Sequence, residues 1–231
     1  MEKRYYKLTD ETIEVYGKTL YRIECIEDFQ CAQKGDKGGF IENEKNLYCD
    51  AWVYDNACVY GNACVYGNAR VYGNARIYGG ARVHGGAHVY GDARIYGGAW
   101  VNGGADIFGY ANIYGNACVY GRTRVYGNAC VYGNAHVYGD AWVYGDADIS
   151  DNAKIESDND YCSFSCFGSA NRTTTAFKQK DNSIMIKCGC FSGSIDKFIE
   201  RVKETHRDNK YAKEYMAIVE VIKIKFFEKT I

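Results

Sequence analysis

The chain has 231 residues, with 28 basic and 29 acidic side chains and a formal net charge of −1. This balance gives the molecule as a whole no attraction to duplex nucleic acid or to a membrane, so we expect neither as a partner. Glycine is abundant at 26 residues, tyrosine very abundant at 22, and proline is absent. Such a composition is typical of a sequence repeat rather than of an ordinary globular domain.

The N-terminal sequence MEKRYYKLTDETIEVYG contains no apolar run of signal-peptide length, and the chain has no window long and apolar enough for a membrane helix. We therefore expect a cytoplasmic protein. The cysteine count of 11 is odd, and the cysteines within the repeat have no regular partner spacing. These features favour free thiols in a reducing compartment over a disulfide framework.

The first element expected in chain order is a β cap over residues 1–40. Residues 5–26 alternate in a strand-like way around Tyr16, Gly17 and Lys18, which predicts a hairpin. The segment QKGDKGGFIENE that follows is rich in glycine and predicts the entry into the repeat. Because a stack of strands has open edges that invite aggregation, we expect the hairpin to cover one end of the repeat.

The repeat occupies residues 41–160 and consists of six-residue words such as VYGNAC and VYGNAR. An aliphatic residue recurs at every sixth position from Leu47 to Ile155, and Ala follows four positions later, with Thr123 replacing it once and Asn159 ending the series. A period of six does not match a helical face, and a glycine in every word would be costly in a helix. The pattern therefore predicts short strands joined by tight turns, with the aliphatic and Ala side chains pointing inward.

This word resembles the hexapeptide repeat of left-handed parallel β-helix proteins, which places an aliphatic residue first and a small residue fifth. The resemblance covers about half of the chain. It implies a mainly β fold, a left-handed parallel β-helix with three words in each triangular coil and about six coils. Equivalent positions of successive coils then lie above one another, and the Tyr residues in second position are expected to stack ring upon ring outside.

After the repeat, residues 161–231 predict a small α/β domain. The segment TTTAFKQKDNSIMIKCGCF predicts a hairpin that turns at Asp181 and Asn182. Ser194 is the expected N-cap of a helix with one apolar face, and a second helical stretch begins at about Tyr211.

Both flanks resemble segments of uncharacterised hexapeptide-repeat proteins found in phages, prophages and low-GC bacteria. The segments are LYRIECIEDF and GDKGGFIENEKNL before the repeat, and GSANRTTTAF, CGCFSG and THRDNKYAKEY after it. The resemblance extends to nearly the whole chain and implies no established chemistry. For a phage-encoded chain, the expected compartment is the host cytoplasm.

The residue before each aliphatic position varies most and faces outward together with the Tyr that follows. Taking every third word sorts these variable residues onto three walls. The first wall carries Cys64, Arg82, Trp100, Cys118 and His136; the second carries Trp52, Arg70, His88, Asp106, Arg124 and Trp142; the third carries Cys58, Arg76, Arg94, Asn112, Cys130 and Asp148. Each wall mixes cations with aromatic rings, a combination that suits planar anionic ligands.

The first wall departs most from the repeat, because His84 and Asn102 replace Tyr in adjacent coils next to Arg82 and Trp100. A purely structural repeat does not need that change, although drift of exposed positions would also produce it. We predict a site for a small phosphorylated or nucleotide ligand, with arginines binding phosphate and a ring stacking on the base. The candidate ligand-binding residues are Arg82, His84, Trp100, Asn102, His136, Arg76 and Arg94.

Hexapeptide-repeat proteins are most often acyltransferases, which implies an alternative function: acyl transfer from coenzyme A with a His as general base. Those enzymes usually interrupt the coils with a loop, and the base needs an orienting partner. No word is interrupted here, and no orienter is evident in the sequence for His84, His88 or His136. We therefore predict no catalytic residue and no cofactor.

The C-terminal segment carries a set of residues that could hold zinc: Cys162, Cys166, Cys188, Cys190 and His206. One pair of cysteines has three intervening residues and the other pair has one, so the two-residue knuckle of typical zinc sites is missing. Buried free thiols are the preferred interpretation, and we predict no metal.

The repeat exposes many Tyr side chains, and the chain has three Trp residues, all on the predicted walls. This aromatic surface is larger than a monomer normally leaves in water. We expect a homo-oligomer, with a trimer favoured by the resemblance and a dimer second. The predicted function is a non-catalytic binding protein of the kind with which a phage sequesters a host defence signal; a purely structural display module is a further alternative.

Overall fold

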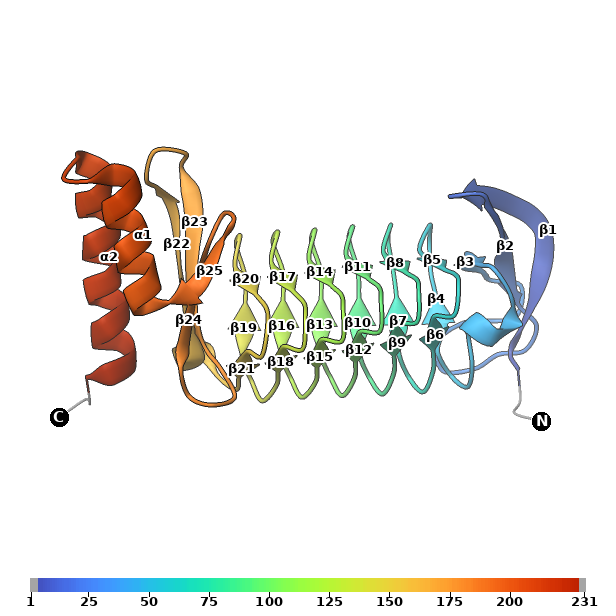
Figure 1. The fold of residues 1–231 in the computed structure, drawn as a ribbon. Coiled ribbons are helices and arrows are strands. Elements are labelled where there is room, and N and C mark those ends of the chain that lie inside the picture. The colour runs from blue at the N-terminus through green and yellow to red at the C-terminus, as the bar shows by residue number, and fades with distance from the viewer. Residues whose placement is uncertain (1–3, 229–231) are drawn as a thin grey trace.

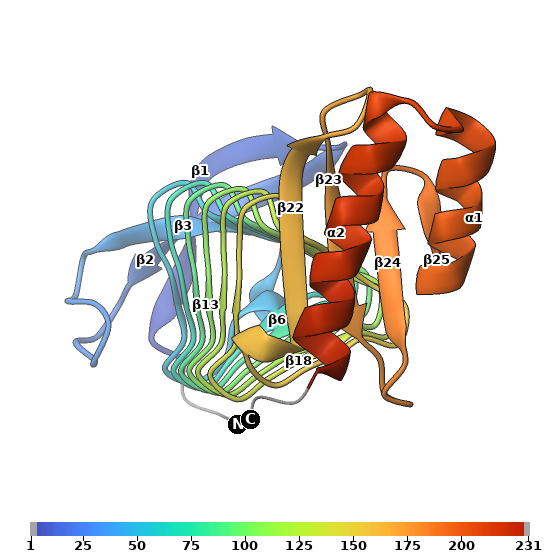
Figure 2. The same cartoon turned by 90° about the vertical axis from the view of Figure 1, so that its left-hand side faces the viewer.

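The computed structural model describes residues 4–228, and its central element is a parallel β-solenoid (Figure 1). Strands of successive coils pair in parallel register, as Val59 does with Ile77 and Ile77 does with Ile95 through a shared wall. The coils superpose when viewed along the solenoid axis (Figure 2). The mainly β fold and the solenoid of about six turns expected from the repeat are thus confirmed.

Three of the sheets form the walls of the solenoid. The first wall comprises β6 (Cys64–Val65), β9 (Arg82–Val83), β12 (Trp100–Val101), β15 (Cys118–Val119), β18 (His136–Val137) and β21 (Lys154–Ile155). The second wall comprises β4 (Trp52–Val53), β7 (Arg70–Val71), β10 (His88–Val89), β13 (Asp106–Ile107), β16 (Arg124–Val125) and β19 (Trp142–Val143). The third wall comprises β3 (Lys37–Ile41), β5 (Cys58–Val59), β8 (Arg76–Ile77), β11 (Arg94–Ile95), β14 (Asn112–Ile113), β17 (Cys130–Val131) and β20 (Asp148–Ile149).

The positions of the six-residue repeat have the structural roles that the sequence predicts: a buried core, short paired strands and tight corners. The aliphatic and Ala side chains, such as Val83 and Ala87, are fully buried along the solenoid axis. Backbone hydrogen bonds join the coils, as the amide of Arg82 donates to the carbonyl of Ala99 at 2.9 Å. At the corners a Gly is required twice over: Gly103 has φ +68, and a Cβ there would lie 2.9 Å from the next coil's backbone nitrogen.

Aromatic side chains stack along the outside of the walls. On the third wall an unbroken ladder has ring centroids 4.7 to 5.1 Å apart in nearly parallel planes. Its rings are those of Tyr60, Tyr78, Tyr96, Tyr114 and Tyr132. The stacking expected from the second letter of the word is confirmed, and it adds an outer layer of contacts between coils.

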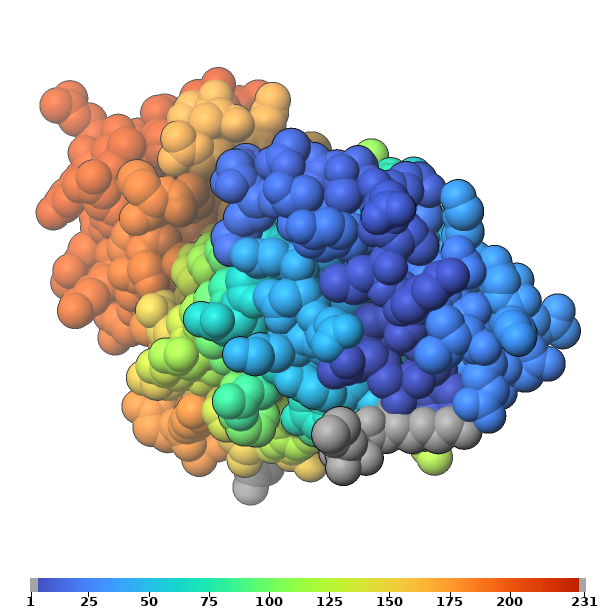
Figure 3. Space-filling model, turned by 90° about the vertical axis from the view of Figure 1, so that its right-hand side faces the viewer, coloured from blue at the N-terminus to red at the C-terminus, as the bar shows by residue number. Residues whose placement is uncertain are grey.

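An antiparallel hairpin of β1 (Tyr6–Val15) and β2 (Lys18–Cys25) caps the N-terminal end of the solenoid (Figure 3). Its two turn residues, Tyr16 and Gly17, both have positive φ, as a tight type I′ turn requires. Strand β2 pairs with β3, which itself pairs in parallel with the coil strand β5, so the cap continues the third wall. The short helix η1 (Glu44–Asn46) leads into the repeat.

The C-terminal segment forms a four-stranded antiparallel sheet with two helices. The elements are η2 (Asp158–Asp160), β22 (Tyr161–Phe167), β23 (Arg172–Lys178), β24 (Ile184–Cys188), β25 (Phe191–Ser194), α1 (Ile195–His206) and α2 (Lys210–Phe227). The predicted hairpin is β23 and β24, and Ser194 caps α1 as expected. Sequence reasoning missed the two outer strands, β22 and β25.

This sheet lies between the solenoid and the helices (Figure 1). Phe177 of β23 is fully buried in the core of the solenoid, whereas its neighbour Ala176 belongs to the core shared with α1 and α2. The period of two along a strand thus assigns one face of the sheet to each layer. No helix within residues 4–228 is long and apolar enough to cross a membrane.

Candidate functional site

The structure divides the predicted ligand-binding residues between two walls. The first wall carries Arg82, His84, Trp100, Asn102 and His136, and the third wall carries Arg76 and Arg94. The two groups are therefore separate candidate sites.

On the first wall, the guanidinium of Arg82 lies over the ring of Trp100, with 4.9 Å between its central carbon and the ring centroid. The two residues are direct partners on neighbouring strands. The cation is thus matched by the face of an aromatic ring, an arrangement worth about 0.5–1 kcal/mol at an exposed site. Trp100 is 41% exposed and offers its remaining surface to solvent.

The two histidines of the first wall lie in different surroundings. His84 stacks on Tyr66 with ring centroids 4.6 Å apart, and burial together with the neighbouring Arg82 lowers the pKa of its imidazole. His136 pairs with Cys118 one coil beyond Trp100, and burial together with Lys180 lowers the pKa of His136. Because a coil separates His136 from Trp100, the structure does not bring it into one site with Arg82.

On the third wall, Arg76 and Arg94 are direct partners on adjacent strands. Neither forms an ion pair with a carboxylate anywhere in the described part of the chain. Arg76 has an aromatic neighbour in Tyr16 at the hairpin tip, 6.0 Å from the ring centroid. Like charges directly opposite each other in a sheet are destabilising. The pairing of Arg76 with Arg94 therefore does not stabilise the fold.

The two arginines line a cleft of about 590 Å³ between the β1–β2 hairpin and the third wall. The hairpin contributes Ile13 and Val15, which pack near the wall's own Tyr60. Asparagine and aspartate side chains at the coil corners complete the polar side of the cleft: Asn56, Asn74 and Asp92. The cleft therefore has a cationic floor, an apolar roof and hydrogen-bonding groups along one edge.

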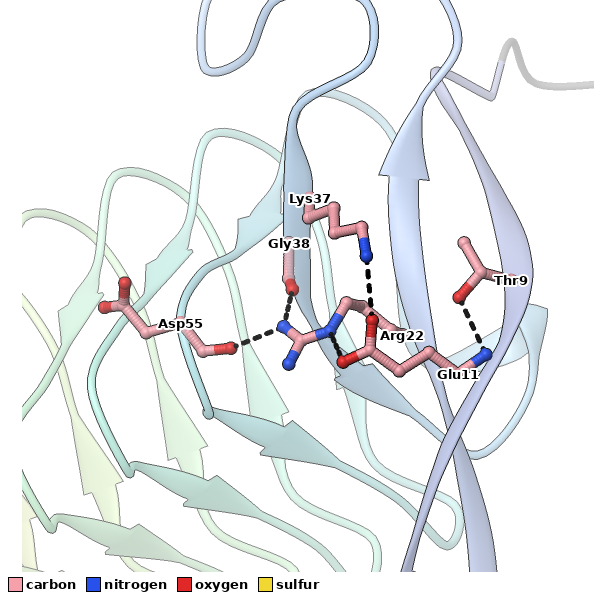
Figure 4. A network of polar contacts seen from close by, with 6 residues as sticks. All are labelled: Thr9, Glu11, Arg22, Lys37, Gly38 and Asp55. Atoms are coloured by element: carbon pink, nitrogen blue, oxygen red, sulfur yellow. Dashed lines mark hydrogen bonds and ion pairs between the residues drawn. The ribbon is translucent and has the colours of Figure 1, made fainter.

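Arg22 of β2, which also lines the cleft, joins the hairpin to the start of the solenoid through hydrogen bonds (Figure 4). Its Nε donates to Glu11 at 2.6 Å, and its Nη1 donates to the carbonyls of Gly38 at 2.7 Å and Asp55 at 3.1 Å. Hydrogen bonds from Lys37 and Arg22 lower the pKa of the Glu11 carboxyl. The charge of Arg22 is thus neutralised by the cap itself, unlike the charges of Arg76 and Arg94.

Sequence reasoning missed that the hairpin leans over the third wall, and with it the contribution of Arg22 to the cleft. A signal was available in β1, where Ile13 and Val15 alternate with the polar residues Thr12 and Glu14. An apolar face on a hairpin predicts a surface to cover, but it does not say which wall.

On the second wall the charges compensate one another. Asp106 lies 3.7 Å from Nδ1 of His88 and 3.7 Å from Nε of Arg124. Arg124 also lies over the ring of Trp142 at 4.7 Å. His88 therefore has a carboxylate neighbour that the sequence did not reveal, but the distance exceeds a hydrogen bond and both side chains are part-exposed on an open wall.

The cysteines of the C-terminal domain are free thiols. Cys188 and Cys190 border a cavity of about 160 Å³ together with His206, whereas Cys162 borders a different one and Cys166 is exposed. Within residues 4–228, no three His, Cys, Asp or Glu side chains are close enough to hold a metal ion.

Comparison with known families matches parts of the solenoid. Four segments match the YdcK Beta solenoid repeat: residues 69–85, 87–103, 119–139 and 129–145. These parts of the chain belong to the β-solenoid, and their repeats are similar to the YdcK type. No curated protein matches the chain.

Proposed function

We propose that this solenoid is a non-catalytic binding protein that captures a small phosphorylated ligand of the nucleotide type in the cleft over the third wall. The observation that carries the proposal is the pair Arg76 and Arg94, in register and without a carboxylate partner, on the floor of a cleft of about 590 Å³. That volume lies within the range of roughly 300–1,000 Å³ typical of small-molecule sites.

The chemistry of the cleft suits such a ligand. Each guanidinium can donate two parallel hydrogen bonds to a phosphate, and a dianion between Arg76 and Arg94 would remove their mutual repulsion. The Asn74 amide donates to Asp92 at 3.3 Å and has a second N–H to offer. Ile13 and Val15 offer an apolar surface to a sugar or base. Three or four such contacts are enough for micromolar affinity, about −8 kcal/mol.

The biological role that fits this chemistry is sequestration of a nucleotide signal, as in the phage-type role expected from the flanking segments. The proposal includes a homo-oligomer, with a trimer first and a dimer second. It is supported by the second wall, where Trp142 and Tyr144 are 41% and 51% exposed. Clustered aromatic surface of this kind is characteristic of protein interfaces.

Calorimetry on the purified full chain tests the proposal, with cyclic dinucleotides, cyclic trinucleotides, ADP-ribose, NAD and coenzyme A as probes. We expect one of them to bind and the double variant Arg76→Ala/Arg94→Ala to bind it at least a hundredfold more weakly. Arg122→Ala, which removes an exposed arginine at a coil corner, is the matched control and should bind as the wild type does. Undiminished binding in the double variant, or no binding of any probe to the folded protein, would overturn the proposal; the second result would favour a display module.

A further inference from the structure

The aromatic ladder of the first wall lacks one ring. In successive coils its positions are occupied by Tyr66, His84, Asn102, Tyr120 and Tyr138. Tyr66 stacks on His84 with ring centroids 4.6 Å apart and 10° between the planes, and Tyr120 stacks on Tyr138 at 5.2 Å and 7°. Asn102 lies in the coil between the two stacked pairs and contributes no ring.

The spacing of the coils fixes the size of this gap. The amide of His84 donates to Val101 and the amide of Asn102 donates to Val119, each at 2.9 Å, so the coils are regularly spaced here. Two strand spacings of ~4.8 Å place the rings of His84 and Tyr120 about 10 Å apart. On the third wall the same separation between alternate coils is filled by a tyrosine ring. The gap therefore has the thickness of one planar ring with a stacking partner on each side.

Two side chains of the first wall at this level have polar atoms without partners. Nε2 of His84 is buried and has no hydrogen-bond partner among the described residues. The side-chain amide of Asn102 likewise forms no hydrogen bond within residues 4–228. Buried polar atoms are nearly always paired in native proteins, so the unpaired Nε2 shows that the first wall lacks a hydrogen-bond partner at His84.

We infer that the first wall binds a planar heteroaromatic ring, of the size of a nucleobase or nicotinamide, inserted between His84 and Tyr120 at the level of Asn102. The amide of Asn102 can both donate to and accept from the polar edge of such a ring. Arg82, held over Trp100, lies on the adjacent coil and supplies a cation for an anionic substituent of the ligand. Stacking platforms of this kind tolerate different bases because every base has a π face.

This site is on a different wall from the arginine cleft, so it does not rest on the function proposed above. The neutral imidazole favoured by the lowered pKa of His84 fits a stacked ring that carries no negative charge of its own. The inference concerns the ring and the proposed function concerns the phosphate, and the two can be tested separately.

The decisive variant is Asn102→Tyr, which restores the repeat and fills the gap with the protein's own ring. We expect it to fold at least as stably as the wild type. Phe108→Tyr, which makes an aromatic exchange in the ladder of the second wall, is the matched control. The probes are adenosine, guanosine, cytidine and nicotinamide, none of which carries a phosphate for the arginine cleft, with inorganic phosphate as the probe that lacks a ring.

Calorimetry and saturation-transfer NMR on the ring protons give the readout. We expect a ring-bearing probe to bind the wild type, the Phe108→Tyr variant and the Arg76→Ala/Arg94→Ala variant alike, and to bind Asn102→Tyr at least tenfold more weakly. Phosphate alone should not compete with adenosine or guanosine. Equal binding to Asn102→Tyr would overturn the inference, and so would the failure of every ring-bearing probe to bind the folded wild type.

Discussion

Thr123 occupies a position where every other word of the repeat from residue 51 to residue 153 has alanine. Its side chain is fully buried, and its hydroxyl has no hydrogen-bond partner among the described residues. The corner beside it is also distorted, since Gly121 has φ +84 whereas the equivalent Gly103 has φ +68. We predict that removing this hydroxyl stabilises the protein.

The magnitude follows from what each substitution removes. A buried hydroxyl without a partner costs about 1–3 kcal/mol, and Thr123→Val removes it while keeping the shape of the side chain. We expect Thr123→Val to raise the free energy of unfolding by about 1–2 kcal/mol. Thr123→Ala also loses a buried methyl worth about 0.8 kcal/mol, so its gain should be smaller. Thr123→Ser keeps the hydroxyl, loses the methyl and should destabilise.

Thermal and urea unfolding of the four proteins measure these differences. For a chain of this size, 1 kcal/mol corresponds to a shift of about 2–4 °C in Tm. From most to least stable, we expect the residue at position 123 to rank as Val, Ala, the wild-type Thr and Ser. A Val variant less stable than the wild type would refute the reasoning, because it would mean that the hydroxyl is paired in the folded protein.

Four further predictions concern the cap, the C-terminal domain and the walls. Lys187→Met should lower the free energy of unfolding by about 1–3 kcal/mol in urea titrations, because it removes the hydrogen bond that Lys187 donates to the Tyr132 hydroxyl between the C-terminal sheet and the third wall. Lys37 and Arg22 lower the pKa of the Glu11 carboxyl, so the ionised carboxyl stabilises the fold at pH values above its ordinary pKa of 4.5, and this stabilisation is lost as the pH falls through the folded pKa. Glu11→Gln should therefore reduce the loss of unfolding free energy that acid causes in the wild type. Incubation with acetyl coenzyme A should release no thiol above background; acyl transfer that both His88→Ala and Asp106→Asn abolish would show that His88 and the carboxylate near it support catalysis. Light scattering at micromolar concentration should give a mass two or three times that of the 26.0 kDa chain; a stable monomer would contradict the oligomer.

The cap illustrates what the sequence could not determine. The hairpin was predictable from the alternation around Tyr16 and Gly17, but its position over Arg76 was not. A hairpin packs through contacts between residues far apart in the chain, as Val15 does with the cluster around Tyr60, and no local period encodes which wall it covers. The cleft exists only because of that packing.

The repeat, unlike the cap, could be placed from the sequence alone. Its period alone places Val, Ile and Ala inside and the variable letter outside, because a word that recurs without insertion must repeat the same backbone geometry. Once each coil is assigned three words, the neighbours Arg76 and Arg94, and Asn102 between His84 and Tyr120, can be read from the sequence by counting. The tertiary structure decided what the count could not: that the hairpin roofs one arginine pair, that Asp106 lies between His88 and Arg124, and that a buried nitrogen of His84 has no partner. The physical reason is that register along a solenoid is a local, periodic property, whereas burial and charge compensation depend on which distant segments come to lie over each wall.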